Sequence, residues 1–168
     1  MNIKAVASGG NSGDGGKTNI NTTGYNLYAG SGGGGAGATL KYSGNALTVS
    51  ITNGKVTLTS SEGDNIVLNK GGTGSDYTNG SAGSGGTGGT KSATNINNSF
   101  TETNIDVGSA GNSPKKSSNN GQIEPTPPLG GMPGINYYNY GIGKEGAYSF
   151  HQTTISNQSV KITFVLQS

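Results

Sequence analysis

Apolar and polar residues alternate in one central stretch of the chain, and this alternation predicts strands. Residues 47–52 read Leu-Thr-Val-Ser-Ile-Thr, an Asn53-Gly54 pair follows, and residues 55–59 read Lys-Val-Thr-Leu-Thr. An Asn-Gly pair between alternating β-formers is the best short-range signal of a β-hairpin, because both residues tolerate positive φ. With a two-residue turn, the predicted cross-strand pairs are Thr52 with Lys55, Ile51 with Val56 and Val49 with Leu58. All four apolar residues then share one face.

Other stretches carry weaker strand signals. Residues 3–7, 65–69 and 100–107 each show a short apolar or alternating pattern. In residues 159–167 the apolar side chains fall on one face, at Val160, Ile162, Phe164 and Leu166. No window shows a 3.6-residue apolar period. The sequence therefore predicts an all-β chain with little or no helix, built from short hairpins.

Glycine-rich stretches separate these strand signals. Glycine recurs every third residue at 10, 13 and 16 and again at 80, 83, 86 and 89, and residues 32–35 are an unbroken glycine run. A three-residue period fits an extended helix with three residues per turn and no internal hydrogen bonds. Such polyglycine II-like segments at 9–16, 30–37 and 71–89 could lie side by side and bond to one another. Flexible linkers or irregular loops are the alternative.

The composition makes an ordinary core doubtful. Of 168 residues 33 are Gly, 20 Ser, 20 Asn and 19 Thr, and only 29% are hydrophobic. The length allows one domain, 1–168. We divide it into a Gly-rich segment 1–38, a hairpin region 39–70, Gly/Pro-rich loops 71–134 with all five prolines, and C-terminal strands 135–168. Order then has to come from backbone hydrogen bonds, partner chains or both, and we expect an oligomer.

Several classes of function are disfavoured. The chain has no Cys, one His, no Arg and a net charge of +2. These numbers argue against disulfides, thiolate chemistry, multi-His metal sites and duplex DNA binding. No apolar run is long enough to span a membrane, and the first residues are a poor signal sequence. We expect no nucleic-acid partner, no membrane insertion and no export by the general secretory route.

Candidate catalytic and ligand-binding motifs are weak. Residues 10–18 resemble a phosphate-binding loop, but the first required glycine is Asn11. No spacing selects a pair of carboxylates for catalysis. Oxygen ligands for calcium could come from Glu62, Asp64 and Asn65, or from Glu102, Asn104 and Asp106, although turn and surface chemistry explains both groups as well. We expect no catalytic residue, cofactor or metal, and no enzyme activity.

Tyrosines near the C-terminus are the best candidates for recognition. Tyr flanked by Asn and Gly is typical of adaptable binding loops, and such rings also stack on sugars. The alternative is that these rings cover a small core or a subunit contact. The candidate contact residues are Tyr137, Tyr138, Tyr140, Tyr148 and His151.

The Gly runs at Gly32–Gly37 and Gly80–Gly89, the short hairpins and the closing strand from Val160 to Phe164 resemble the glycine-rich domains of bacteriophage tail proteins. In that family such domains occur on tail fibres, tip adhesins and other virion parts. In some adhesins Gly-rich helices form a rigid sandwich that carries receptor-reading loops. The resemblance implies that the leading candidates for receptor-reading loops are the Pro-rich segment 114–134 and the Tyr cluster 135–150.

The functional expectation is therefore a non-enzymatic virion structural protein, made in the host cytoplasm and located in a tail fibre, tail tip or similar appendage. Its expected partners are copies of itself, other virion proteins and a host surface glycan or outer-membrane protein. A capsid decoration, cement or head-fibre protein is the second hypothesis. A bacterial surface appendage or matrix subunit is the third.

Overall fold

The structure is a computed structural model that describes residues 1–13, 29–76, 83–96, 98–113, 129–137, 140–146 and 159–166. These residues contain strands and no helix, which confirms the all-β prediction. The strands are β1 Asn2–Val6, β2 Gly37–Tyr42, β3 Leu47–Thr52, β4 Lys55–Ser60, β5 Asn65–Leu68, β6 Lys91–Thr94, β7 Phe100–Asp106 and β8 Lys161–Val165.

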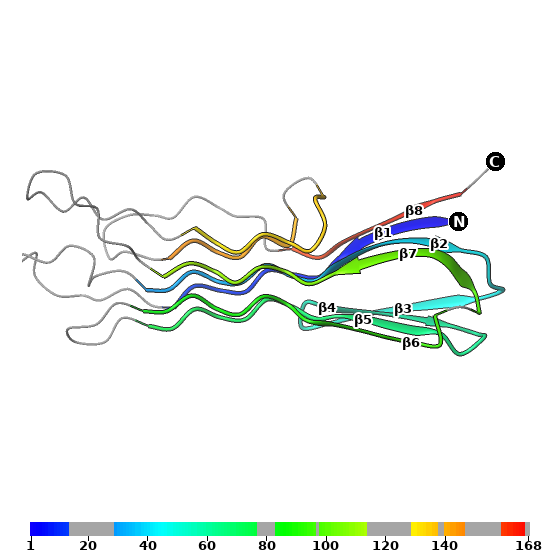
Figure 1. Cartoon of the computed structure of the whole chain (residues 1–168), viewed down its shortest axis with the longest axis horizontal. Helices are drawn as coiled ribbons and strands as arrows, with labels where there is room; N and C mark the ends of the chain where they lie inside the picture. The colour runs from blue at the N-terminus through cyan, green and yellow to red at the C-terminus, as the bar shows by residue number, and fades with distance from the viewer. Residues whose placement is uncertain are drawn as a thin grey trace, which may run out of the picture.

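The strands form two antiparallel four-stranded sheets that face each other (Figure 1). One sheet has the order β7-β2-β1-β8 and the other has the order β3-β4-β5-β6. Lys91 of β6 donates a hydrogen bond to the carbonyl of Ile105 in β7, so β6 lies over β7. The edge strands β3 and β8 consequently lie together on the other side of this sandwich.

The predicted hairpin is present in the predicted register. Ile51 lies opposite Val56 and Val49 lies opposite Leu58. Asn53 and Gly54 have φ values of 50° and 79°, as a type I′ turn requires. Val56 and Leu58 are fully buried, whereas Val49 and Ile51 of the edge strand β3 are exposed. The shared apolar face is therefore only half covered.

Four further strands overlap the predicted stretches, and two do not. β1, β5, β7 and β8 correspond to the weaker signals. β2 begins inside a Gly-rich run, and β6 has the polar sequence Lys-Ser-Ala-Thr. Both strands exist because tertiary pairing supplies what local propensity lacks: β2 bonds to β1 and β7, and β6 bonds to β5.

On the two central strands β1 and β2, the side chains that face the core become smaller along the strands. The rings of Tyr42 and Phe100 fill one end, with centroids 5.1 Å apart. Ile3 and Leu40 follow on these two strands, and alanines at 5, 7, 36 and 38 end the series, beside the larger Ile105 and Ile162 of the flanking strands. Smaller side chains allow closer backbones, so the sandwich narrows in this direction (Figure 1). Glycine-rich segments leave the sheets at the narrow end.

Candidate functional site

Glycine-rich segments extend side by side from the narrow end of the sandwich (Figure 1). We call them the Gly bundle and name its inner member, residues 30–36, the central segment. The six other described members are 7–13, 69–76, 83–90, 107–113, 129–134 and 141–146.

Amides of the central segment point in three directions with a three-residue repeat. Gly30, Gly33 and Ala36 donate to carbonyls of segment 69–76. Ser31 and Gly34 donate to segment 107–113, and Gly32 and Gly35 donate to segment 141–146. Residues three apart therefore share one partner, which is the repeat of a backbone with three residues per turn.

Carbonyls of the central segment follow the same repeat toward three other neighbours. Those of residues 30, 33 and 36 accept from segment 7–13, those of 31 and 34 accept from segment 83–90, and those of 32 and 35 accept from segment 129–134. The central segment is thus hydrogen-bonded to six neighbours. Further bonds join each neighbour to the next around a closed ring. Buried backbone groups, which must be paired, find their partners in this lattice.

Close backbone approach explains why the central segment is glycine. A Cβ atom added at any of its glycines would come within 3.0 Å of a neighbour's carbonyl oxygen. Ser31 is its one polar side chain and is fully buried. The Ser31 hydroxyl donates to Leu129 O at 2.6 Å and accepts from Asn112 N at 2.7 Å. Ser31 therefore links two neighbouring segments, a role that its place in a glycine run signals and that the sequence analysis missed.

Several described segments of the chain end at the side of the Gly bundle away from the sheets, which we call the far end. Gly13 donates to Gly30 O, Gly30 to Ser75 O, and Ser75 to Ser84 O. On the other side of the central segment, Asn112 donates to Leu129 O. The described residues that flank 14–28, 77–82 and 114–128 therefore lie at one level of the bundle.

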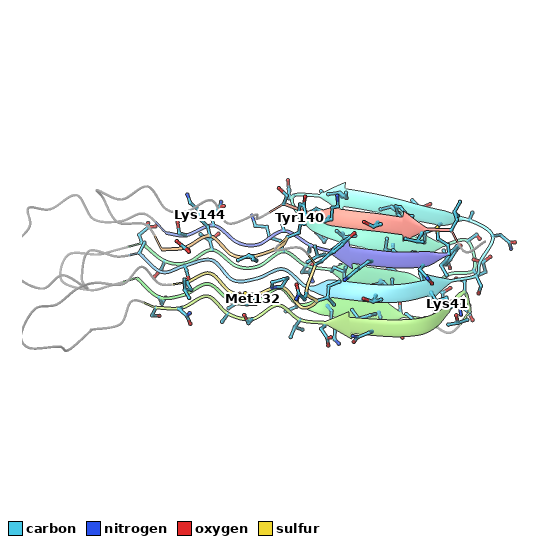
Figure 2. The ribbon with its side chains drawn as sticks, turned by 90° about the horizontal axis from the view of Figure 1, so that it is seen from above. Lys41, Met132, Tyr140 and Lys144 are labelled. Carbon is cyan, nitrogen blue, oxygen red and sulfur yellow. The ribbon has the colours of Figure 1, made fainter. Side chains whose placement is uncertain are left out.

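The Tyr cluster contributes two described residues at the junction of sheet and bundle. Tyr137 is buried against the outer face of the β7-β2-β1-β8 sheet, and its hydroxyl is hydrogen-bonded to Thr163. Lys4 Nζ lies 4.8 Å from the centre of its ring. Tyr140 is labelled in Figure 2, and the centre of its ring lies 6.3 Å from the centre of the Tyr137 ring. The Nζ atom of Lys161 lies over the Tyr140 ring. For Tyr137 this geometry supports the packing alternative.

A shallow cavity of about 340 Å³ opens beside Tyr137 on the outer sheet face, lined also by Lys4, Thr39, Thr163 and Val165. The other candidates, Tyr138, Tyr148 and His151, lie outside the described residues, so their recognition role stays a prediction.

Asp64 is a buried carboxylate at the wide end of the sandwich. It accepts hydrogen bonds from the hydroxyls of Ser60 and Ser99 and from the amides of Asn98 and Ser99. Burial acts to raise the pKa of Asp64, but these donors outweigh it and hold the pKa below its ordinary value. The group ties the β4–β5 turn to the connection before β7. Its oxygens are occupied by protein donors, so its role here is structural.

Glu62 lies beside this turn. Its Oε1 accepts from the amide of Asn45 at 2.9 Å and from Asn45 Nδ2 at 3.0 Å. The backbone hydrogen bond from Asn45 is the largest cause that lowers the pKa of Glu62. Its Oε2 is buried without a hydrogen bond among the described residues. Burial, followed by the charges of Glu62 and Asp64, raises the pKa of the neighbouring Tyr42.

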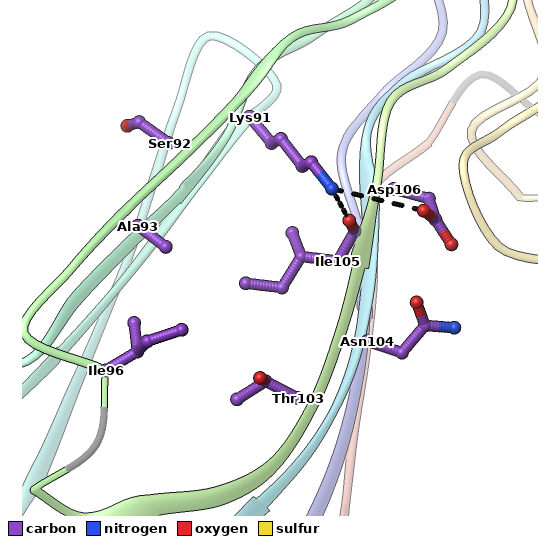
Figure 3. Close-up of a pocket in the computed structure, with 8 residues that line it drawn as sticks. All are labelled: Lys91, Ser92, Ala93, Ile96, Thr103, Asn104, Ile105 and Asp106. Atoms are coloured by element: carbon purple, nitrogen blue, oxygen red, sulfur yellow. Dashed lines mark hydrogen bonds and ion pairs between the residues drawn. The ribbon is translucent and has the colours of Figure 1, made fainter.

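The second predicted acidic group lies on β7. Glu102, Asn104 and Asp106 occupy alternate positions of this strand, as predicted. Asp106 lies 4.0 Å from Lys91 Nζ (Figure 3). Within the described part of the chain, no three His, Cys, Asp or Glu side chains are grouped to hold a metal ion.

The phosphate-loop-like residues begin within the Gly bundle. The amide of Gly10 donates to Gly33 O and the Gly10 carbonyl accepts from Lys144 N. The Gly13 amide is engaged by Gly30 O. These amides bind protein rather than converge on an open anion site, and residues 14–18 of the motif lie outside the described residues.

A membrane-crossing helix, long and apolar enough to span a bilayer, does not occur in the described ranges. Comparison with family models, curated proteins and solved structures gave no match to this chain.

Proposed function

We propose that the chain is a non-enzymatic structural protein of a bacteriophage virion, located in a tail fibre, tail tip or another exposed appendage. The observation that carries the proposal is the central segment with hydrogen bonds to six glycine-rich neighbours. This arrangement supports a rigid stalk made of polyglycine II-like helices, because main-chain hydrogen bonds to six surrounding segments resist bending and sliding.

The far end supports a role in presentation. Several described segments of the bundle end at one level, while the N-terminus and the end of β8 lie at the opposite end of the molecule (Figure 1). Loops held on a rigid scaffold are a common arrangement for recognition. We propose that the far end faces a host surface glycan or outer-membrane protein, and that the sandwich faces other virion proteins.

Electron microscopy with an antibody against this chain tests the location. Particles from the source culture are labelled, with pre-immune antibody as the control. Label on fibres or the tail tip supports the proposal. Label spread over the head shell would favour a capsid decoration or head-fibre protein, and label on cells but never on particles would favour a bacterial surface appendage.

A further inference from the structure

The four edge strands of the sandwich differ in how they are protected. Natural sheets block their edges with charged side chains, prolines or bulges. β6 carries Lys91, β8 carries Lys161, and β7 carries Asp106 together with a register shift. β3 reads Leu-Thr-Val-Ser-Ile-Thr and carries none of these features over its six residues.

On the β6–β7 side of the sandwich, a lysine side chain protects the sheet edges from pairing with another strand. A hollow of about 470 Å³ opens there between the two sheets (Figure 3). Lys91 reaches across it from β6, bonds to the Ile105 carbonyl and lies near Asp106. A second strand that paired here would have to displace this lysine and desolvate its charge, which is costly.

The β3 side offers the opposite environment. In a hairpin with a two-residue turn, Thr52 is hydrogen-bonded to Lys55 across the two strands. Because the direction of the main-chain hydrogen bonds alternates along a strand, the amides and carbonyls of Val49 and Ile51 point away from β4. Their side chains lie on the face that continues the core, yet Val49 is 37% exposed and Ile51 56% exposed. On the facing sheet, Phe164 of β8 is 46% exposed on the same side.

We propose that β3 pairs in antiparallel fashion with β3 of a second copy of this chain, about a two-fold axis at Val49. Val49 then lies opposite its own copy and Leu47 opposite the partner's Ile51, which provides about six main-chain hydrogen bonds. The apolar faces of the two hairpins join into one stripe that Phe164 of each copy covers. The sequence of β3 suits this pairing because it is uncharged, so no like charges meet across the axis.

A second copy is favoured over a foreign strand because residues 47–51 of β3 are self-complementary about Val49. The outward-bonding positions 47, 49 and 51 are symmetric about Val49 and are all apolar, while 48 and 50 are both small and polar. This pairing does not depend on the virion role, and the microscopy above can fail without affecting it.

Light scattering of the purified full chain tests the interface. We expect about twice the 16.7 kDa of one chain. Val49→Lys places a charge in the joint stripe and is expected to yield a monomer with an unchanged far-ultraviolet spectrum. The matched control is Ser92→Lys on the other exposed edge, β6, which should remain dimeric. A monomeric wild-type chain, or a dimer that survives Val49→Lys in folded form, overturns the proposal.

Cysteine cross-linking checks the register independently of any folding effect. The chain has no Cys, so Val49→Cys introduces the sole thiol. Opposed residues of a hydrogen-bonded antiparallel pair lie about 5.5 Å apart at Cα, within reach of a disulfide. Mild oxidation should give a covalent dimer for Val49→Cys and none for Ser92→Cys. Equal cross-linking of the two variants would contradict a β3-specific contact.

Discussion

Single positions in the central segment are limited by space rather than by conformation alone. A Cβ at position 33 would come within 3.0 Å of Thr87 O, which belongs to a backbone that is itself bonded to its neighbours. We expect Gly33→Ala to lower the free energy of unfolding by at least about 3 kcal/mol, the upper range for overpacking, because no flexible side chain can move aside. Thermal unfolding measures the loss.

An exposed position in the same bundle supplies the control for Gly33. Thr73 lies on segment 69–76 and is exposed. Thr73→Ala should change stability by less than about 0.5 kcal/mol, as is usual for surface positions. If the two variants unfold at the same temperature, the close approach around the central segment is not a determinant of stability.

Asp64 gives the molecule a predictable response to acid. Its pKa is lower in the folded chain than its ordinary value, so the unfolded state binds the proton more readily. The stabilisation is fully present above the unfolded pKa of about 4 and is lost as pH falls through the folded value. Asp64→Ala leaves several buried donors without an acceptor and should cost about 3 kcal/mol at pH 7.

The pH profile of stability separates this role from simple packing. Denaturant unfolding of Asp64→Ala should show a smaller decrease below about pH 4 than the wild type shows. Asp106→Asn is the control, because its side chain is 51% exposed and its contact with Lys91 is worth less than about 1 kcal/mol. Parallel acid profiles of wild type and Asp64→Ala would contradict the assignment.

At the scale of elements, the sequence predicts the β3–β4 hairpin because its signals are local. Alternation and the Asn53-Gly54 turn lie within a dozen residues and agree on one register. The sequence analysis did not predict β2 and β6, because these strands form by pairing with strands that lie far away in the sequence. The glycine spacing suggested that 9–16, 30–37 and 71–89 lie side by side, and hydrogen bonds do join the residues of these ranges that the structure describes.

Residues that organise distant segments were harder to find. Ser31 differs from its glycine neighbours, but its partners Asn112 and Leu129 are about 80 and 100 positions away. Asp64 was considered as a calcium ligand together with Glu62, because the sequence does not show that Ser60 and Ser99 supply its donors. Its local spacing fits either chemistry, and only the fold distinguishes them.

Because the sandwich narrows toward the Gly bundle, we expect its central strands to tolerate only small core-facing side chains near that end. Ala38 of β2 is fully buried near the narrow end, two residues from Leu40 on the same face. Ala38→Leu should lower the free energy of unfolding by about 1–3 kcal/mol, because the added volume forces the sheets apart where the bundle begins. Chemical denaturation measures it. Thr39→Leu, on the exposed outer face of the same strand, should have little effect, and comparable losses would argue against the narrowing.

At the scale of the whole molecule, two kinds of stabilisation meet end to end. The sandwich buries aromatic and aliphatic side chains, whereas the central segment of the Gly bundle buries main chain and small groups. The heat capacity change of unfolding rises with exposed apolar surface and falls with exposed polar surface. An ordinary protein of 168 residues gives about 2.0–2.5 kcal/mol/K. We expect about 1.0–1.5 kcal/mol/K for this chain.

Differential scanning calorimetry at several pH values measures this quantity from the dependence of the unfolding enthalpy on the unfolding temperature. An all-β globular domain of similar length, measured in the same buffers, is the control. The same stretches of chain run from the sandwich into the Gly bundle. We therefore also expect both parts to unfold in one cooperative transition. A heat capacity change equal to the control's would mean that apolar burial stabilises this chain as it does an ordinary protein, and the hydrogen-bonded glycine lattice would then be a minor contributor.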